Sequence, residues 1–225
     1  MFKNKELIIF DLDGTIIDSV PDLAASVNYM LESLQRDQFE EKIIREWVGN
    51  GAQTLVKRAL VGKSDGFEDV DKQLFESALE IFLAHYEKNV CVKTLMYNNV
   101  EQTLQTLHSL GYHLAIVTNK PFLFVAPILK KLSIDSYFGT IVGGDTLEQK
   151  KPHPLPLLSV CETLAITTDK ALMIGDSKND ILAAKNANIE SVGVSYGYNY
   201  GEHISRYAPE KVVDDMLEIL DILVK

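Results

Sequence analysis

The chain has 225 residues, of which 46% are hydrophobic, and its formal net charge is −10. This length can hold one large domain or two small ones, with enough core to fold without crosslinks. The negative charge argues against a nucleic-acid-binding surface, and no run of about 18 apolar residues predicts a membrane span.

The first predicted element is a buried strand over residues 7–10, a short apolar run that ends at Asp11. Asp13 and Gly14 follow directly. Two carboxylates one residue apart repel each other unless a cation or a shared proton compensates them. In open α/β sheets, ligands bind where the strands end. The segment therefore predicts a nucleophile and a metal site at one edge of a sheet. A calcium-binding loop is excluded because Ile16 stands where such a loop needs glycine.

Residues 20 to 90 have a helical pattern, with apolar side chains on single faces of segments 23–34 and 75–86. Between these two stripes, residues 41–48 and 52–60 predict shorter helices around Gly49. We expect no strand in this block.

After residue 90, short apolar runs alternate with helical segments. We expect a helix over 100–110 and strands over 113–118, 139–144, 171–175 and 191–195, followed by an edge strand over 211–214 and a closing helix over 216–224. This alternation predicts a parallel sheet with helices on both faces. The helical block of residues 20–90 would then be an insertion above the carboxyl ends of the strands, where a lid belongs.

The later strands also end in small or polar residues: Thr118-Asn119-Lys120, Gly143-Gly144-Asp145 and Gly175-Asp176-Ser177. We therefore expect four strands to bring such residues together at one edge of the sheet. Thr118 is suited either to a phosphate oxygen or to a helix cap.

Two further charged positions suggest a site. Lys151 stands next to Pro152, which aims it more firmly than an ordinary surface lysine. Asp180, four residues after Asp176, places a second carboxylate on the same helical face.

Four of these motifs, in this order, resemble the signature of the haloacid dehalogenase-like superfamily of phosphotransferases. They are residues 11–15, residues 118–120, Lys151, and residues 175–177 with Asp180. The resemblance covers essentially the whole chain. It implies an α/β fold: a Rossmann-like, doubly wound parallel sheet in a core of residues 1–17 and 92–225, with a small α-helical cap of residues 18–91 inserted in it.

The resemblance also implies a mechanism. Asp11 would attack phosphorus, and Asp13 would protonate the leaving alcohol and then activate water. Asp180 would orient Lys151 or a metal-bound water. The remaining implied groups are Thr118 and Lys151 for the phosphoryl group, Asn119 for phosphate, and Asp11, the Asp13 carbonyl and Asp176 for Mg²⁺.

Residues 47–52, 55–60 and 196–199 resemble bacterial phosphoglycolate phosphatases. Gly49 would let the backbone approach an anion, and Arg58, with Lys57 as the alternative, would neutralise a substrate carboxylate. Asn99 and Asn188 stand where this family often has glycine. Because asparagine tolerates turn geometry, the turns should survive.

We therefore expect a phosphoric monoester hydrolase acting on a small phosphorylated metabolite, foremost 2-phosphoglycolate. Another small phosphate ester as substrate, or a sugar-phosphate mutase of the same fold, stays open. A phosphate-sensing scaffold without activity is disfavoured by the intact motifs. Two distant cysteines, Cys91 and Cys161, and the lack of a secretory signal indicate a cytoplasmic protein. We expect no nucleic acid or membrane partner, and either a monomer or a homodimer.

Overall fold

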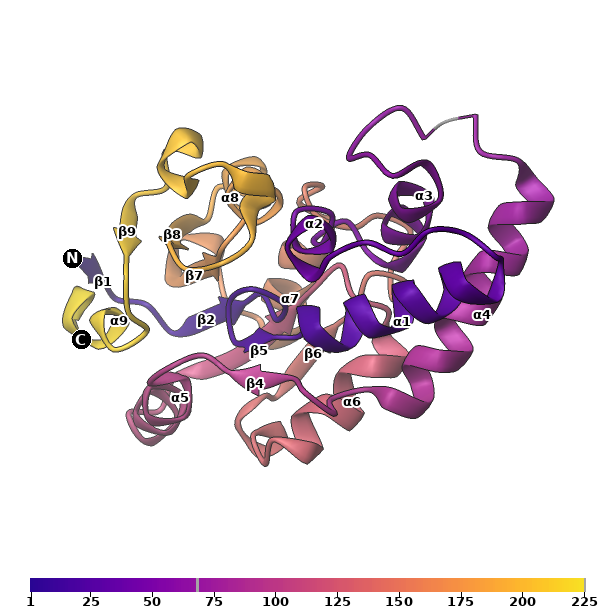
Figure 1. Ribbon diagram of the computed structural model, residues 1–225. Coiled ribbons are helices and arrows are strands. Elements are labelled where there is room, and N and C mark those ends of the chain that lie inside the picture. Colours follow the sequence, from indigo (N-terminus) through magenta and orange to yellow (C-terminus); the bar gives the residue numbers. More distant parts are fainter. Residues whose placement is uncertain (68, 225) are drawn as a thin grey trace.

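A central sheet of six parallel strands organises the chain, of which the computed structural model describes residues 1–67 and 69–224 (Figure 1). From one edge to the other, the strands are β6 (Thr140–Val142), β5 (His113–Val117), β2 (Leu7–Phe10), β7 (Ala171–Gly175), β8 (Glu190–Val194) and β9 (Lys211–Val213). Every neighbouring pair is parallel, which confirms the doubly wound α/β core. The chain proceeds from β2 outward to β6 and then crosses to β7 on the other side of β2. In such sheets, ligands bind at the point where the strand order reverses.

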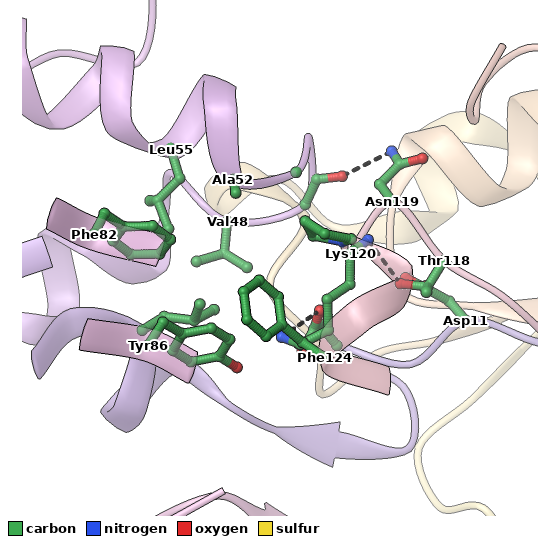
Figure 2. A pocket seen from close by; sticks show the side chains of 15 residues that line it. Asp11, Val48, Ala52, Leu55, Phe82, Tyr86, Thr118, Asn119, Lys120 and Phe124 are labelled. Carbon is green, nitrogen blue, oxygen red and sulfur yellow. Dashed lines mark hydrogen bonds and ion pairs between the residues drawn. The ribbon is translucent and has the colours of Figure 1, made fainter. Parts of the chain in front are cut away.

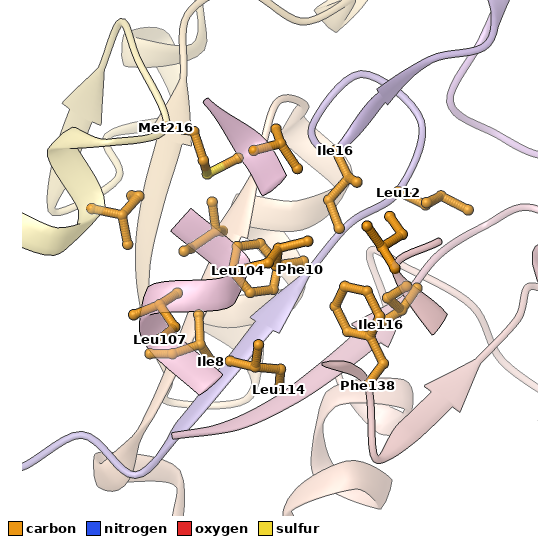
Figure 3. Close-up of a cluster of buried hydrophobic side chains, with 14 of the residues drawn as sticks. Ile8, Phe10, Leu12, Ile16, Leu104, Leu107, Leu114, Ile116, Phe138 and Met216 are labelled. Carbon is orange, nitrogen blue, oxygen red and sulfur yellow. The ribbon is translucent and has the colours of Figure 1, made fainter. Parts of the chain in front are cut away.

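Strand β2 lies at the centre because all four of its side chains are apolar and completely buried. Side chains alternate between the faces of a strand. Ile8 and Phe10 join the apolar cluster on one face (Figure 3), and Leu7 and Ile9 join the cluster on the other. Each such burial stabilises the fold by roughly 1.5–3 kcal/mol.

Helices cover both faces of the sheet. The helices are α5 (Val100–Ser109), α6 (Phe122–Lys131) and α9 (Glu218–Ile222) on the face of Phe10, and α7 (Leu155–Leu164) and α8 (Lys178–Asn186) on the face of Ile9. Short 3₁₀ turns lie at Asp135–Tyr137, Thr168–Lys170, Asn199–Gly201 and Ile204–Tyr207. In the described ranges, no helix is both long and apolar enough to span a bilayer.

The block after β2 is helical, as its periodicity predicts, and lies together at one side of the molecule (Figure 1). It consists of α1 (Val20–Ser33), α2 (Glu41–Arg45), α3 (Ala52–Val61) and α4 (Lys72–Asn89). The apolar stripes of α1 and α4 form its core. This core continues onto the sheet domain, because the ring of Phe124 on α6 packs edge-on against Tyr86 with 4.9 Å between ring centroids.

Two short antiparallel strands flank the helical block. They are β3 (Ile17–Asp18) and β4 (Leu95–Met96). The pairing brings both connections between the block and the sheet side by side. The sequence pattern does not predict this pairing, because two-residue strands carry no readable alternation. The division into a core of 1–17 and 92–225 and a cap of 18–91 stays a prediction.

The turns with asparagine survive. Asn99 and Asn188 both adopt left-handed backbone conformations, with φ of 62° and 54°. Asparagine enters this region more readily than most residues, so the expectation for both turns is confirmed.

Two predicted helices are shorter than expected. The helix predicted over 41–48 ends at Arg45. The closing helix predicted over 216–224 spans Glu218–Ile222, after which β10 (Leu223–Val224) pairs in parallel with β1 (Phe2–Lys3). The last apolar residues therefore belong to a strand that joins the two ends of the chain.

Candidate active site

The site lies where the three central strands end. Asp11 follows β2, Thr118 follows β5 and Asp176 follows β7. Because β5, β2 and β7 are parallel neighbours, their carboxyl ends meet at one edge, as the sequence analysis predicts. All three side chains are buried.

Lys151 reaches this edge from the segment before α7. Its Nζ lies 2.9 Å from Oδ1 of Asp11 and 2.6 Å from Oδ1 of Asp180, and it donates a hydrogen bond to the carbonyl of Val117. Burial disfavours its ammonium group, but the two carboxylates outweigh burial and raise the pKa of Lys151. Lys151 is therefore a fixed cation beside Asp11 rather than a solvated surface lysine.

Asp180 is held on both of its oxygens. Oδ1 contacts Lys151, and Oδ2 accepts hydrogen bonds from the backbone N–H and the hydroxyl of Ser177. This is the reciprocal N-terminal cap of α8. Asp180 thus fixes Lys151 and starts the helix at the same time.

Asp11, Asp176 and Asp180 form a buried acidic cluster. Each offers a carboxylate oxygen, and these oxygens lie within 4.8 Å of one another. Burial raises the pKa of Asp11 to about 7, although Lys151 opposes the change. Burial and the neighbouring Asp180 and Asp11 raise the pKa of Asp176 well above its usual range. A cation would relieve this repulsion.

Asp11 and Asp176 are the cluster members best placed to hold that cation. Oδ1 of Asp11 is buried and makes no hydrogen bond of good geometry. Asp176 accepts hydrogen bonds from the hydroxyl of Thr15 and the N–H of Tyr198, at 3.2 and 2.7 Å. A Cβ at Gly197 would lie 2.1 Å from Cβ of Asp176, so the chain needs glycine there to let Asp176 sit at the site. Carboxylate oxygens suit hard divalent cations.

Asp13 is held by two donors. Its Oδ1 accepts a hydrogen bond of 2.5 Å from the Ser19 hydroxyl, and its two oxygens lie 3.0 and 3.2 Å from Nζ of Lys120. Lys120 is buried. Burial opposes its charge, but Asp13 more than compensates and raises the pKa of Lys120.

Lys120 also belongs to the site, although the sequence pattern did not assign it there. It lies in the motif Thr118-Asn119-Lys120, two residues after a candidate phosphate ligand. This nearness in the sequence is the signal that could have identified it.

A small cavity of about 40 Å³ separates these groups from the cap (Figure 2). By the rule that one water needs roughly 10–15 Å³, it has room for about three water molecules. Its core side is polar and is formed by Asp11, Asp13, Thr118, Asn119 and Lys120. A larger cleft of about 720 Å³ adjoins it and shares Gly51, Ala52, Asn119, Pro121 and Phe124 with it.

The predicted cap residues lie in different places. Gly49 lines the cavity, and its carbonyl accepts hydrogen bonds from the side-chain amides of Asn119 and Asn179, at 3.0 and 3.1 Å. The amide of Asn119 therefore joins the cap to the core. It also donates to the carbonyl of Lys151 at 3.1 Å.

Arg58 does not line the cavity in the described part of the chain. Its guanidinium donates to the carbonyls of Trp47 and Ser64, at 2.6 and 2.8 Å, and lies over the rings of Phe67 and Tyr200. Lys57 lies over the ring of Phe75 and is also outside the lining. The structure thus brings together the predicted core residues and Gly49, but not the two predicted cap cations.

Comparison with known proteins agrees with this geometry. The family model for haloacid dehalogenase-like hydrolases matches residues 8–194. Phosphoglycolate phosphatases of Colwellia psychrerythraea and Psychrobacter arcticus are 49% and 48% identical to the chain, over 97% and 99% of its length and 96% and 97% of theirs. The crystal structure of a predicted phosphoglycolate phosphatase from Haemophilus somnus has 39% identity and a TM-score of 0.91, covering 97% of this chain and 98% of that one.

The match spans nearly all of β2, the helical block and the strands up to β8, so it includes the three aspartates of the acidic cluster and the residues that line the cavity. The chain belongs to the haloacid dehalogenase-like hydrolase family.

Proposed function

We propose that the chain is a Mg²⁺-dependent phosphatase that hydrolyses small phosphate monoesters, with 2-phosphoglycolate as the substrate, through an aspartyl-phosphate intermediate. The observation that carries this proposal is that Asp11 and Asp13 both line one small cavity while Lys151 lies 2.9 Å from Asp11. One carboxylate is then available as nucleophile and the other as acid and base. The names of the relatives support the choice of substrate.

The reaction follows from the positions of the side chains. A carboxylate oxygen of Asp11 attacks phosphorus, and the ester P–O bond breaks as the new P–O bond forms. Asp13, in its protonated form, gives its proton to the departing alcohol. Asp13 then removes a proton from a water that attacks the aspartyl-phosphate, releasing phosphate and restoring Asp11.

Lys151 and Thr118 suit the transferring phosphoryl group, whose charge spreads over its peripheral oxygens. The lysine supplies a cation fixed by Asp180, and the threonine supplies a hydroxyl that lines the cavity. Lys120 holds the Asp13 carboxylate in place during both proton transfers.

The charges at the site support a divalent cation. The four carboxylates of Asp11, Asp13, Asp176 and Asp180 face two ammonium groups, those of Lys120 and Lys151, which leaves a formal charge of −2. Asp11, Asp176 and the carbonyl of Asp13 would hold Mg²⁺ there. When bound, Mg²⁺ neutralises this charge and polarises the phosphoryl oxygens.

The closeness of the cap to the core supports a substrate with a small alcohol portion. The enclosed space of about 40 Å³ holds about three water molecules, which is less than a phosphate ester occupies, so the cap has to move away from the core to admit one. Beyond the phosphoryl group, 2-phosphoglycolate carries only a CH₂ and a carboxylate, so it requires a smaller movement than a sugar phosphate does.

Phosphate release tests the proposal. We expect Mg²⁺-dependent release from 2-phosphoglycolate to exceed release from 3-phosphoglycerate, glycerol 3-phosphate and glucose 6-phosphate, and to disappear with a chelator. Asp11→Asn is the inactive control. A different preferred ester would keep the mechanism and change the substrate, whereas release by Asp11→Asn would refute Asp11 as nucleophile.

A further inference from the structure

Tyr86 on α4 places a buried hydroxyl at the cavity, on the side of the cap. The residue is 1% exposed and lines the cavity. Its ring is held by stacking on Phe82 and by the edge-on contact with Phe124. Its Oη makes no hydrogen bond of good geometry with the described part of the chain, although the ammonium group of Lys120 lies close enough to influence it. A lysine ammonium only donates, so the proton of this hydroxyl is available to an acceptor on a ligand.

The cap offers little else that is polar. The other cap residues that line the cavity within the described ranges are Leu23, Val48, Gly49, Gly51, Ala52, Leu55 and Phe82. In Figure 2, Tyr86 extends from this apolar wall across from the polar core side. A polar group at the far end of a substrate would therefore meet the hydroxyl of Tyr86 on the cap side.

The surroundings of Tyr86 favour an acceptor with negative charge. Nζ of Lys120 lies 4.9 Å from the centroid of the Tyr86 ring. Burial raises the pKa of Tyr86 to about 12 despite this ammonium group, so the hydroxyl keeps its proton at neutral pH and can donate it. A carboxylate accepts hydrogen bonds only. A neutral donor suits it, whereas the charge of Lys120 is largely balanced by Asp13.

We propose that Tyr86 determines specificity by donating a hydrogen bond from Oη to the carboxylate of the substrate, the role that the sequence suggests for Arg58. The inference rests on the proposed phosphatase function. It deepens that function by assigning recognition of the distal carboxylate to α4.

The test compares Tyr86→Phe with the unmodified protein on two esters with the same two-carbon chain. These are 2-phosphoglycolate and ethyl phosphate, which has a methyl group in place of the carboxylate. Because a hydrogen bond to a charged group is lost, we expect kcat/KM for 2-phosphoglycolate to fall about 10- to 100-fold, mainly through KM. The value for ethyl phosphate should stay within about twofold, because its methyl group makes no use of the hydroxyl.

Tyr29→Phe is the matched control. Tyr29 lies on α1 of the same cap, is half exposed and stacks on His85, so the identical chemical change there should alter neither substrate. The Tm of Tyr86→Phe should equal or exceed that of the unmodified protein, since the change removes a buried hydroxyl without a partner. A clear fall in Tm would point to a structural role and overturn the inference.

Binding gives a readout that is independent of turnover. In the Asp11→Asn background, calorimetry should show that Tyr86→Phe weakens 2-phosphoglycolate binding by the same factor as the KM change. Equal loss on both esters, or no loss on either, would overturn the role of Tyr86 while leaving phosphatase activity in place. If the unmodified protein releases phosphate from none of the esters, the proposed function fails and this inference fails with it.

Discussion

Asp11→Asn should remove activity and at the same time stabilise the fold. The pKa of Asp11 is about 7, against an ordinary value of 3.8, so the folded chain binds this proton more tightly than the unfolded chain does. The stability of the unmodified protein therefore falls as the pH rises from about 4 to 7. Above pH 7 the carboxylate is ionised in the folded protein and destabilises it fully, whereas an asparagine at this position carries no charge and causes no such destabilisation.

The structure sets the size of this effect. The two pKa values of Asp11 differ by about 3, and each pKa unit corresponds to about 1.36 kcal/mol, so the ionised carboxylate destabilises the fold by at most about 4 kcal/mol at pH 8. At pH 5 only the interval from pH 3.8 to pH 5 contributes, and the destabilisation is roughly 1.5 kcal/mol. A chain of this size gains about 2–4 °C in Tm for each kcal/mol. We expect the stabilisation by Asp11→Asn to be at least about 4 °C greater at pH 8 than at pH 5.

Thermal unfolding with a chelator present checks this prediction, because a bound cation would mask the repulsion. Asp37→Asn, at an exposed position, makes the same chemical change outside the site and should shift Tm by less than about 1 °C at both pH values. If Asp11→Asn lowers Tm at pH 8, or changes it equally at pH 5 and pH 8, then the ionised Asp11 is not a cost to the fold and the electrostatic reasoning is wrong.

The remaining predictions concern the roles assigned to Lys120 and Arg58 and the binding of Mg²⁺. Lys120→Met leaves the half-buried Asp13 without its ammonium partner and removes a buried lysine, so we expect kcat to fall at least about 10-fold and stability to fall by about 1–3 kcal/mol; steady-state kinetics and Tm check both, and an unchanged kcat would contradict the role of Lys120. Arg58→Ala removes hydrogen bonds to backbone carbonyls, so it should cost about 1–3 kcal/mol and change KM equally for 2-phosphoglycolate and ethyl phosphate; a larger effect on 2-phosphoglycolate would return Arg58 to the substrate. Mg²⁺ should raise Tm more at pH 8 than at pH 6, because below pH 7 the ion competes with the proton on Asp11; an Asp176→Asn variant should lose most of this increase.

The convergence of Asp11, Thr118 and Asp176 could be predicted because it depends only on topology. Each residue follows a parallel strand, and the strands are neighbours, so the ends must meet wherever the intervening chain runs. The burial pattern of β2 follows in the same way from its four apolar residues. Regular elements thus fix both the core and the main residues of the site.

The cap side of the cavity could not be predicted, because there the direction of a side chain decides its role. Arg58 and Leu55 lie three residues apart on α3, yet only Leu55 lines the cavity. Tyr86 falls on the apolar stripe of α4, and periodicity assigns its ring to a core without indicating where the hydroxyl points. Lys120 pairs with Asp13 through a loop whose conformation the sequence pattern does not specify.

The arrangement of charges bears on how an acidic chain would take up the anionic substrate that we propose. The protein carries a net charge of −10, and the carboxylates of the candidate site would add a local charge that repels phosphate. Lys151 is engaged by Asp11 and Asp180, and Lys120 is engaged by Asp13. Asp176 has no ion-pair partner among the described residues, so in the proposed function a cation held at Asp11 and Asp176 would add to Lys151 the positive charge that a phosphate needs. Since surface charges are screened beyond about 10 Å at ordinary salt, we expect such local positive charge, rather than the net charge, to govern the approach of the substrate.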